Sequence, residues 1–389
     1  MGFYGCLKPV LMRLEPERSH RATIALCAAV ERLGLLDAVE LCFGAPDPIL
    51  RTNVAGIGFP GPVGLAAGFD KNAQAVEVLS RLGFGFIEVG SVSERASAGN
   101  HQRPRLWRLK SDEALRVFYG CPSDGAAAVA ERLQRRQGAV PLGVNLVETN
   151  TACVASAEHT TQELARTVGQ FRALADYLVL NLSCPNMPQG GCGLFDDPKL
   201  LAMLLECCSR HCPLPPLFLK ITPPGDPEDP QVIDSILAAV EPFAFVKGFI
   251  LNIPNRNLHA TLRTPRAELD RMRGGITGPS LRAPTNAAIA AWYGRIDRSR
   301  HVLIGVGGIA SAEDAYEMIR SGASLVQLYT ALVYRGPGLI AQINTGLRRL
   351  IERDGARSIA DVVGVGVRDY ASRKKTNTFR LAEETLIWQ

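Results

Sequence analysis

The stretch VLIGVGGIASAEDAYEMIRSGASLVQLYT, residues 302–330, has the pattern of a β-strand, an α-helix and a second β-strand. Residues 302–306 and 324–329 are short apolar runs rich in β-branched residues, and residues 312–321 carry apolar side chains at helical spacing. Gly307 and Gly308 separate the first strand from the helix. Glycines at such a turn let backbone N–H groups approach a phosphate, and the start of the helix adds the positive end of its dipole. The stretch therefore predicts a βαβ unit with a phosphate site at its first turn.

The same alternation extends over most of the chain. Further strand candidates occupy residues 63–67, 84–92, 141–146, 177–183, 216–221 and 248–252. Helical stretches lie between or after them at residues 73–82, 161–174, 198–211, 230–241, 283–296 and 337–352. Eight strands that alternate with helices predict an α/β fold, a (β/α)8 TIM barrel. A doubly wound open sheet is the alternative, because alternation alone does not prove that the sheet closes.

Polar residues stand at the ends of six of the predicted strands. They are Lys71, Ser91, Asn145, Asn181 to Cys184, Lys220 and Asn252. The loops after the strands of such a barrel converge at one end, so these residues predict a shared site. The loops after the last two strands, which carry the two glycines and then Tyr329 and Thr330, are the usual position of a phosphate. This combination suits a phosphorylated planar cofactor such as FMN, with Lys220 beside the flavin ring.

The composition argues against several classes of protein. With 389 residues, 47% of them hydrophobic, the chain can bury a large core. The net charge of +5 is spread along the chain rather than gathered in a basic block, which gives nucleic-acid binding little support. The ten cysteines are irregularly spaced and form no Cys/His cluster with zinc spacing. We therefore expect reduced thiols and no metal site.

The first 45 residues differ from the rest of the chain. Residues 3–14 and 20–41 carry apolar residues at three- and four-residue intervals and predict a two-helix extension. These helices either pack on the body of the protein or lie on a membrane surface. No apolar run reaches the roughly 18 to 20 residues that a membrane-spanning helix needs. The chain also shows no pattern of a signal peptide.

The expected organisation has three parts. Residues 1–45 form the amphipathic helical segment, residues 46–369 the cofactor-binding barrel and residues 370–389 a C-terminal tail. The tail contains Arg373, Lys374 and Lys375, which suit anionic lipid, but a solvated terminal segment is favoured.

Six segments together resemble dihydroorotate dehydrogenases, FMN-containing barrels that oxidise dihydroorotate to orotate in pyrimidine biosynthesis. They are GLAAGFDKNAQAVEVLSRLGFGFIEVGSV, PRLWRL, LNLSCPNMP, LFLKITPP, GGITGPSL and LIGVGGIASAEDAYEMIRSGASLVQLYTALVYRGPGLI. LEPERSHR near the start and RDGARSIADVVG near the end resemble the membrane-associated, quinone-reducing class. In that class the N-terminal helices form the quinone tunnel. The resemblance therefore implies a quinone as electron acceptor and a peripheral position on the cytoplasmic side of a membrane.

Carried over position by position, the resemblance assigns roles to individual residues. Those that fall where the family holds FMN are Ala66, Ala67, Gly68, Ser91, Asn145, Asn181, Lys220, Gly278, Gly307, Gly308, Tyr329 and Thr330. Those that fall where it holds the substrate are Lys71, Asn181, Asn186 and Asn252. Cys184 falls at the position of the general base, which removes the C5 proton of dihydroorotate while a hydride passes from C6 to the flavin N5.

The sequence departs from the family pattern at this site. Quinone-reducing members usually have serine at the position of Cys184, whereas soluble members have cysteine. The substrate loop VFYGCPS, residues 117–123, keeps only Gly120 of the family residues. The residues that replace expected amides in this loop are Val117, Pro122 and Ser123. Because each unmade hydrogen bond in a recognition site costs about 1 to 3 kcal/mol, these changes bear on substrate choice.

Two further departures lie on neighbouring loops. Glu148 stands where the family usually has a lysine. After the sixth strand ILNIPN, residues 250–255, offers only Asn252 or Asn255 to the substrate.

Three functions follow from these residues. The first is FMN-dependent oxidation of dihydroorotate with a quinone as acceptor. The second is a paralogous FMN oxidoreductase that acts on a different dihydro-ring or enone substrate, and the third is a non-catalytic, membrane-associated flavin-binding protein. Retention of Lys71, Asn181, Cys184 and Lys220 favours an enzyme, because a decayed site has no reason to keep its chemical groups.

Overall fold

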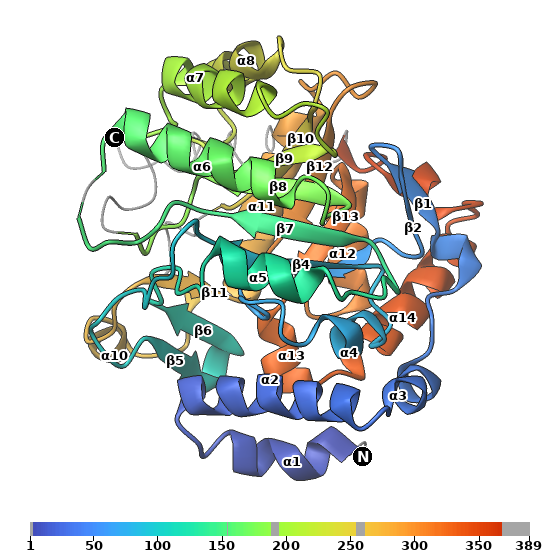
Figure 1. The fold of residues 1–389 in the computed structure, drawn as a ribbon. Coiled ribbons are helices and arrows are strands. Elements are labelled where there is room, and N and C mark those ends of the chain that lie inside the picture. Colours follow the sequence, from blue (N-terminus) through green and yellow to red (C-terminus); the bar gives the residue numbers. More distant parts are fainter. Residues whose placement is uncertain (1–2, 154, 188–193, 254–260, 368–389) are drawn as a thin grey trace, which may run out of the picture.

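The computed structural model describes residues 3–153, 155–187, 194–253 and 261–367, and it contains a closed barrel of eight parallel strands (Figure 1). In chain order the strands are β3 (Val63–Leu65), β4 (Phe86–Val92), β7 (Leu142–Leu146), β8 (Tyr177–Asn181), β9 (Leu217–Ile221), β10 (Val246–Leu251), β12 (Val302–Val306) and β13 (Ala323–Leu328). Each pairs with its neighbours in this order, and β13 pairs with β3 to close the sheet. The predicted (β/α)8 barrel is confirmed, and the doubly wound alternative is wrong.

Helices surround the barrel. They are α4 (Val76–Ser80), α5 (Ala126–Leu133), α6 (Ala157–Phe171), α7 (Pro198–Ser209), α8 (Pro230–Val240), α11 (Arg282–Tyr293), α12 (Ala312–Arg320), α13 (Thr330–Arg335) and α14 (Leu339–Arg353). Local sequence sets where several of them begin. Asp197 and Asp229 each cap a helix by accepting a hydrogen bond at 2.8 Å from a backbone N–H, and a proline occupies the next position.

Aromatic side chains fill the amino-terminal end of the barrel. Phe86, Tyr177 and Phe218, each at or next to the first residue of a strand, meet edge to face, with ring centroids 6.4 and 5.5 Å apart. The hairpin of β1 (Thr52–Val54) and β2 (Ile57–Phe59) packs Val54 and Phe59 onto this cluster. The opposite, carboxyl end of the barrel is therefore the end that can hold a site.

A small antiparallel sheet stands beside that carboxyl end. It consists of β5 (Leu106–Leu109), β6 (Ala114–Val117) and β11 (Gly275–Thr277), with β6 in the middle. The short helix α10 (Arg266–Leu269) precedes β11. The sequence patterns did not predict this sheet. Its strands have only three or four residues, and β11 joins from about 160 positions along the chain.

Three helices precede the barrel: α1 (Phe3–Leu11), α2 (Pro16–Arg32) and α3 (Leu36–Phe43). The second predicted segment is divided because the chain turns at Gly34, whose φ of 68° is left-handed. Helix α2 packs against β5 and α4, and Figure 1 shows α1 and α2 at the edge of the molecule opposite α7. Within the described residues, no helix is long and apolar enough to cross a bilayer. Residues 370–389 lie outside the described part.

Candidate active site

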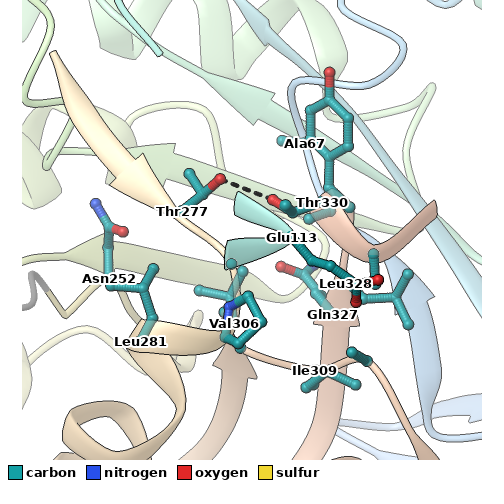
Figure 2. Close-up of a pocket in the computed structure, with 18 of the residues that line it drawn as sticks. Ala67, Glu113, Asn252, Thr277, Leu281, Val306, Ile309, Gln327, Leu328 and Thr330 are labelled. Atoms are coloured by element: carbon teal, nitrogen blue, oxygen red, sulfur yellow. Dashed lines mark hydrogen bonds between the residues drawn. The ribbon is translucent and has the colours of Figure 1, made fainter. Parts of the chain in front are cut away.

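A cavity opens at the carboxyl ends of the barrel strands, where the sequence predicts the cofactor (Figure 2). Asn252, predicted for the substrate, lines it, and so do Thr277 and Gln327, which the sequence analysis did not select. The predicted cofactor residues in its wall are Ala66, Ala67, Lys220, Gly278, Gly307, Gly308, Tyr329 and Thr330. Thr277 and Thr330 join two sides of this wall through a 2.8 Å hydrogen bond between their hydroxyls.

The glycines of this wall have conformations that other residues rarely adopt. Gly278, Gly307 and Gly308 have φ values of 104°, 108° and 80°. A Cβ atom on Gly308 would lie 2.5 Å from the backbone nitrogen of Arg282, so a larger residue does not fit there. Helix α12 begins shortly afterwards, with Ser311 as its N-cap. Bare backbone at a strand-to-helix turn is the arrangement that accepts a phosphate.

Ser91, Asn145 and Asn181 come from three adjacent strands and form a chain of hydrogen bonds. Asn181 Nδ2 donates to Ser91 Oγ at 2.9 Å, and Ser91 Oγ in turn donates to Asn145 Oδ1. Asn145 Nδ2 donates to the buried carboxylate of Glu88 at 2.8 Å. The orientation of all three side chains is fixed by this chain. Gly68 lies nearby, since its N–H donates to the Gly90 carbonyl at 2.7 Å.

Glu88 is the centre of a buried polar cluster inside the barrel. Besides Asn145 it accepts hydrogen bonds from Gln327 Nε2 and, at 3.4 Å, from the Tyr177 hydroxyl. Burial, together with the Glu88 charge, raises the pKa of Tyr177 well above its usual value. The Oε1 atom of Gln327 is buried without a partner in the described part of the chain. Because an unpaired buried acceptor is costly and Gln327 lines the cavity, this oxygen suits a ligand with a ring N–H, as a flavin has.

Cys184 lies three residues beyond the end of β8. The carbonyl of its neighbour Ser183 accepts a hydrogen bond at 3.2 Å from Asn252 Nδ2, and Asn252 lines the cavity, so the chain at Cys184 lies beside the cavity wall. Its Sγ lies 3.2 Å from Sγ of Cys121, and both are free thiols. The Cys121 thiol lowers the pKa of Cys184, assisted by the Asn186 backbone N–H and the Lys220 charge and opposed by burial.

The substrate loop, residues 117–123, places few polar groups at the site. Val117 belongs to β6 and pairs with Gly275, and it packs into an apolar cluster. The buried Ser123 hydroxyl accepts hydrogen bonds from the backbone N–H groups of Gly125 at 3.1 Å and Ser93 at 3.3 Å. Both residues therefore serve the fold of this loop.

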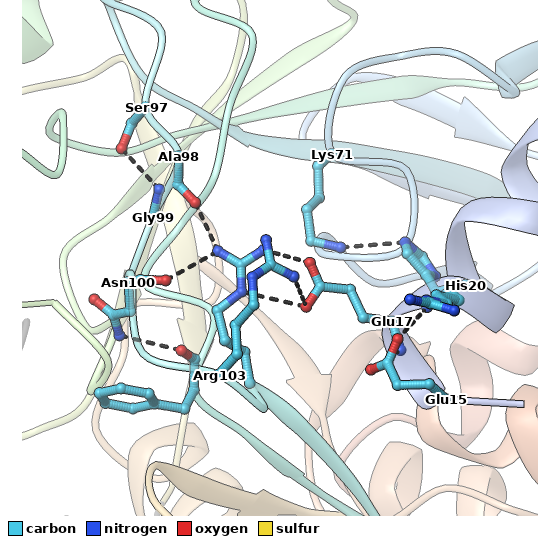
Figure 3. A network of polar contacts seen from close by, with 12 residues as sticks. Glu15, Glu17, His20, Lys71, Ser97, Ala98, Gly99, Asn100 and Arg103 are labelled. Atoms are coloured by element: carbon cyan, nitrogen blue, oxygen red, sulfur yellow. Dashed lines mark hydrogen bonds and ion pairs between the residues drawn. The ribbon is translucent and has the colours of Figure 1, made fainter.

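Lys71 is held by contacts from the barrel and from α2 (Figure 3). Its Nζ donates to the Gly68 carbonyl at 2.7 Å and to His20 Nε2 at 3.2 Å, and it lies 4.5 Å from the centre of the Tyr119 ring. Burial lowers the pKa of Lys71 to about 8, so the ammonium form prevails at neutral pH. Burial and the Lys71 charge lower the pKa of His20 to about 3, so this imidazole is neutral.

A buried ion pair attaches α2 to the loop before β5 (Figure 3). Glu17 accepts hydrogen bonds from Arg105 at both carboxylate oxygens and forms an ion pair with Arg103 at 3.0 Å. The Glu17 and Arg105 residues are only 6% and 5% exposed. Arg105 also donates to the carbonyl groups of Ala98 and Asn100.

Asn186 and Glu148 are two further residues on the loops around the site. The Oδ1 atom of Asn186 is buried and has no partner among the described residues, which leaves it free for a donor on a substrate. Glu148 accepts a 3.0 Å hydrogen bond from Thr160, and burial raises its pKa. Asn255 lies outside the described residues.

The structure thus brings the predicted residues to one end of the barrel, in two neighbouring groups. The polar residues that sequence reasoning missed are Glu17, His20, Glu88, Arg105, Cys121, Thr277 and Gln327. Glu88 and Gln327 carried a usable signal, because each stands in a short strand whose other residues are apolar apart from one serine. No group of three or more His, Cys, Asp and Glu side chains suited to a metal occurs in the described ranges.

Comparison with known proteins decides what this constellation belongs to. A family model described as dihydroorotate dehydrogenase matches residues 49–351. The chain belongs to the dihydroorotate dehydrogenase family. It is therefore an oxidoreductase of a flavin-dependent family that oxidises dihydroorotate. The predicted family is confirmed.

Relatives in this family cover more than nine tenths of the chain. The dihydroorotate dehydrogenase (quinone) of Xanthobacter autotrophicus is 38% identical over 381 residues, covering 95% of this chain and 100% of the relative. That of Halobacterium salinarum is 38% identical over 362 residues, covering 93% and 99%. The structure of Eimeria tenella DHODH in complex with ferulenol matches with a TM-score of 0.76 and 27% identity, covering 93% of this chain and 99% of that one.

Proposed function

We propose that the chain is an FMN-dependent dihydroorotate dehydrogenase of the quinone-reducing type, with Cys184 as its general base. The observation that carries the proposal is that the segment of Cys184 is hydrogen-bonded, through the Ser183 carbonyl, to a cavity whose wall contains eight of the predicted cofactor residues. Family membership and the relatives named dihydroorotate dehydrogenase (quinone) support the same reaction.

The residues present suit FMN. The glycine-rich turn at Gly307 and Gly308 would hold the phosphate, and Gln327 together with the Ser91 chain would face the ring. Lys220 would place its positive charge beside the reduced ring. When bound, the flavin supplies the acceptor for the hydride that leaves the substrate.

The substrate would be held by Lys71, Asn181, Asn186 and Asn252, and its C5 proton would pass to Cys184 Sγ. Lys71 is cationic at neutral pH and suits an anionic oxygen of the substrate. Cys184 is more acidic than an ordinary thiol, so a larger share of it is thiolate, the form that accepts a proton. The overall reaction converts dihydroorotate and a quinone to orotate and a quinol.

A second candidate substrate, a different dihydro-ring or enone, is favoured by one observation. In the substrate loop Val117 is part of β6, and the Ser123 hydroxyl accepts hydrogen bonds from the backbone. Neither residue therefore replaces the amide side chains that the family uses to bind the substrate. The chemistry at Cys184 would be the same.

One experiment tests the proposed function. The purified protein is mixed anaerobically with dihydroorotate while the flavin absorbance is followed, and the chromophore is then released by denaturation and identified. We expect rapid bleaching and a chromophore that is FMN. A flavin that dihydroorotate leaves oxidised, but that another dihydro-ring compound bleaches, would favour the second candidate. FAD, or no bound flavin after reconstitution, would refute the cofactor assignment.

We also propose that the N-terminal helices rest on a membrane surface. Leu33 and Leu41 are 71% and 88% exposed, and the other strongly exposed apolar residues of this region are Val10, Leu14, Leu26 and Leu35. The inner side of α2 already contacts β5 and α4, so these outward side chains suit a lipid interface. His20 of α2 meets the rings of Phe69 and Tyr329, which places this helix between such a surface and the cavity.

The double variant Leu33→Glu/Leu41→Glu is expected to bind vesicles of mixed zwitterionic and anionic phospholipid at least about tenfold more weakly, since each leucine removed from water contributes about 1.5 to 3 kcal/mol. Sedimentation with vesicles measures this. Met203→Glu on α7, which removes an exposed apolar residue from the opposite edge, is the matched control and should bind normally. Equal binding of all three proteins would exclude these helices as the contact.

A further inference from the structure

We propose that Cys121 is a positioning residue for the reaction: it donates its thiol hydrogen to Cys184 and so holds Cys184 as the thiolate that accepts the substrate proton. This inference rests on the proposed role of Cys184 and adds a residue to which no role has been given. It explains how a cysteine serves as base in a chain whose N-terminal helices are of the quinone-reducing type.

The backbone of the substrate loop aims Cys121 at Cys184. Gly120 and Cys121 have φ values of 65° and 52°, two consecutive left-handed residues that turn the chain sharply. The Gly120 carbonyl accepts a 2.9 Å hydrogen bond from Asn150 Nδ2, which fixes the turn. The sulfur atoms come to 3.2 Å, a hydrogen-bonding distance between sulfurs.

The loop that carries Cys184 is connected to Asn150 as well, through Asn100. Asn100 Nδ2 donates to the backbone carbonyl of Asn186 at 3.0 Å and to that of Phe118 at 3.1 Å. Asn100 Oδ1 in turn accepts from Asn150 at 3.2 Å. Asn100 and Asn150 thus hold both the loop of Cys121 and the loop of Cys184, so the backbone on each side of the thiol contact is fixed.

The hydrogen bond from Cys121 to Cys184 decides which sulfur keeps its proton, because the same two charged groups act on both. Lys220 at the end of β9 favours a thiolate at Cys184, whereas Glu148 after β7 opposes it. Cys121 faces the same two groups and Cys184 itself, and both the hydrogen bond to Cys184 and burial raise its pKa well above the usual value. Lys71 lies close enough to Cys121 for their charges to interact, and this interaction by itself favours a thiolate at Cys121. The hydrogen bond to Cys184 and the burial of Cys121 outweigh this attraction, so the proton stays on Cys121 and Cys184 is the sulfur that ionises.

The hydrogen bond has a defined part in the chemical step. The C5–H bond of the substrate breaks, its proton forms an S–H bond with Cys184, and its electron pair becomes the new ring double bond as hydride leaves C6. Cys121 keeps its own hydrogen throughout and neither sulfur changes its oxidation state. A hydrogen bond to an ionised acceptor is about twice as strong as a neutral one, so the contact favours the thiolate before the proton moves.

The test compares the FMN-loaded wild type with Cys121→Ala and Cys121→Ser, under reductant and without oxygen. Two pH profiles are measured: alkylation of Cys184 by iodoacetamide, read by peptide mass spectrometry, and single-turnover flavin reduction at saturating dihydroorotate. In Cys121→Ala both midpoints should rise by about one to two pH units, with flavin reduction at pH 7 about tenfold slower or more. Cys121→Ser keeps a donor and should restore the wild-type midpoints. Cys208→Ala, a buried thiol on α7, is the control.

Three outcomes would overturn the inference: unchanged midpoints in Cys121→Ala, a serine variant that behaves like alanine, or a Cys121–Cys184 disulfide that persists under reductant. Asn150→Ala, which releases the Gly120 carbonyl and touches neither sulfur, should move the alkylation midpoint upward too, and it replaces Cys121→Ala if that variant fails to bind FMN. If dihydroorotate does not reduce the wild-type flavin, the proposed function fails, and the alkylation profile still tests the contact between the thiols.

Discussion

Replacing Cys184 with alanine is expected to slow flavin reduction by dihydroorotate roughly a hundredfold or more, because general-base catalysis contributes about that much. FMN should remain bound, since the cavity wall does not depend on this side chain. Stopped-flow measurement of flavin bleaching, with the flavin content of each sample determined beforehand, gives the rate.

Cys184→Ser is the informative companion of this variant. Serine is the residue that the quinone-reducing class usually has at this position, but its hydroxyl is far less acidic than a thiol. The serine variant should therefore be slower than the wild type at neutral pH and faster than the alanine variant. An alanine variant that is reduced at the wild-type rate would transfer the role of base to another group.

Glu17→Gln is expected to lower the stability of the protein by about 3 kcal/mol, the usual cost of removing one partner of a buried ion pair. The substitution keeps the size of the side chain but leaves the Arg105 guanidinium buried without its counter-charge. Thermal unfolding of the flavin-loaded protein, followed by flavin fluorescence, measures the loss.

A matched surface pair provides the control for this variant. Glu131 and Arg135 on α5 form an ion pair in which both side chains are well exposed. Glu131→Gln makes the same chemical change and should alter stability by no more than about 0.5 kcal/mol. Similar losses in the two variants would mean that burial of the Glu17 pair has no special energetic weight.

The pH dependence of this effect has a definite sign. Burial alone would raise the pKa of Glu17, but Arg105 and Arg103 outweigh burial and hold the pKa below its usual value. The contribution of the ion pair is therefore present above about pH 4.5 and is lost as the pH falls through the lowered pKa. The difference between wild type and Glu17→Gln should shrink in acid.

The barrel was predictable because each of its strands carries its own signal. β7 and β12 are wholly or largely buried, so their sequences LGVNL and VLIGV are short apolar runs that a parallel sheet requires. The sheet of β5, β6 and β11 carried no such signal. Its short strands gain stability only from pairing with segments far along the chain, which no local pattern reports.

The residues of the site also fall into two groups, those that the sequence predicts and those that it does not. Asn145, Asn181 and Lys220 stand at strand ends, so the barrel geometry alone predicts that they meet. Glu88 sits in the middle of a strand, where a search of strand ends does not look. His20 reaches the site only because α2 docks there, and the contact of Cys121 with Cys184 depends on a left-handed turn. Such contacts arise from tertiary structure and are invisible in a single sequence.

Lys71 is hydrogen-bonded both to the barrel and to α2, and this has a thermodynamic consequence. An ammonium group has three hydrogens, and Lys71 already gives one to Gly68 and one to His20. A substrate anion that takes the third, or draws the ammonium toward itself, changes the strength of the bond to α2. Coupling between two binding equilibria is reciprocal. If the anion changes the equilibrium constant for docking of α2 by some factor, then docking of α2 changes the affinity for the anion by the same factor. A quinone or lipid that shifts α2 would therefore alter the affinity for the anion. The two halves of the reaction are then energetically linked at equilibrium, before any electron moves.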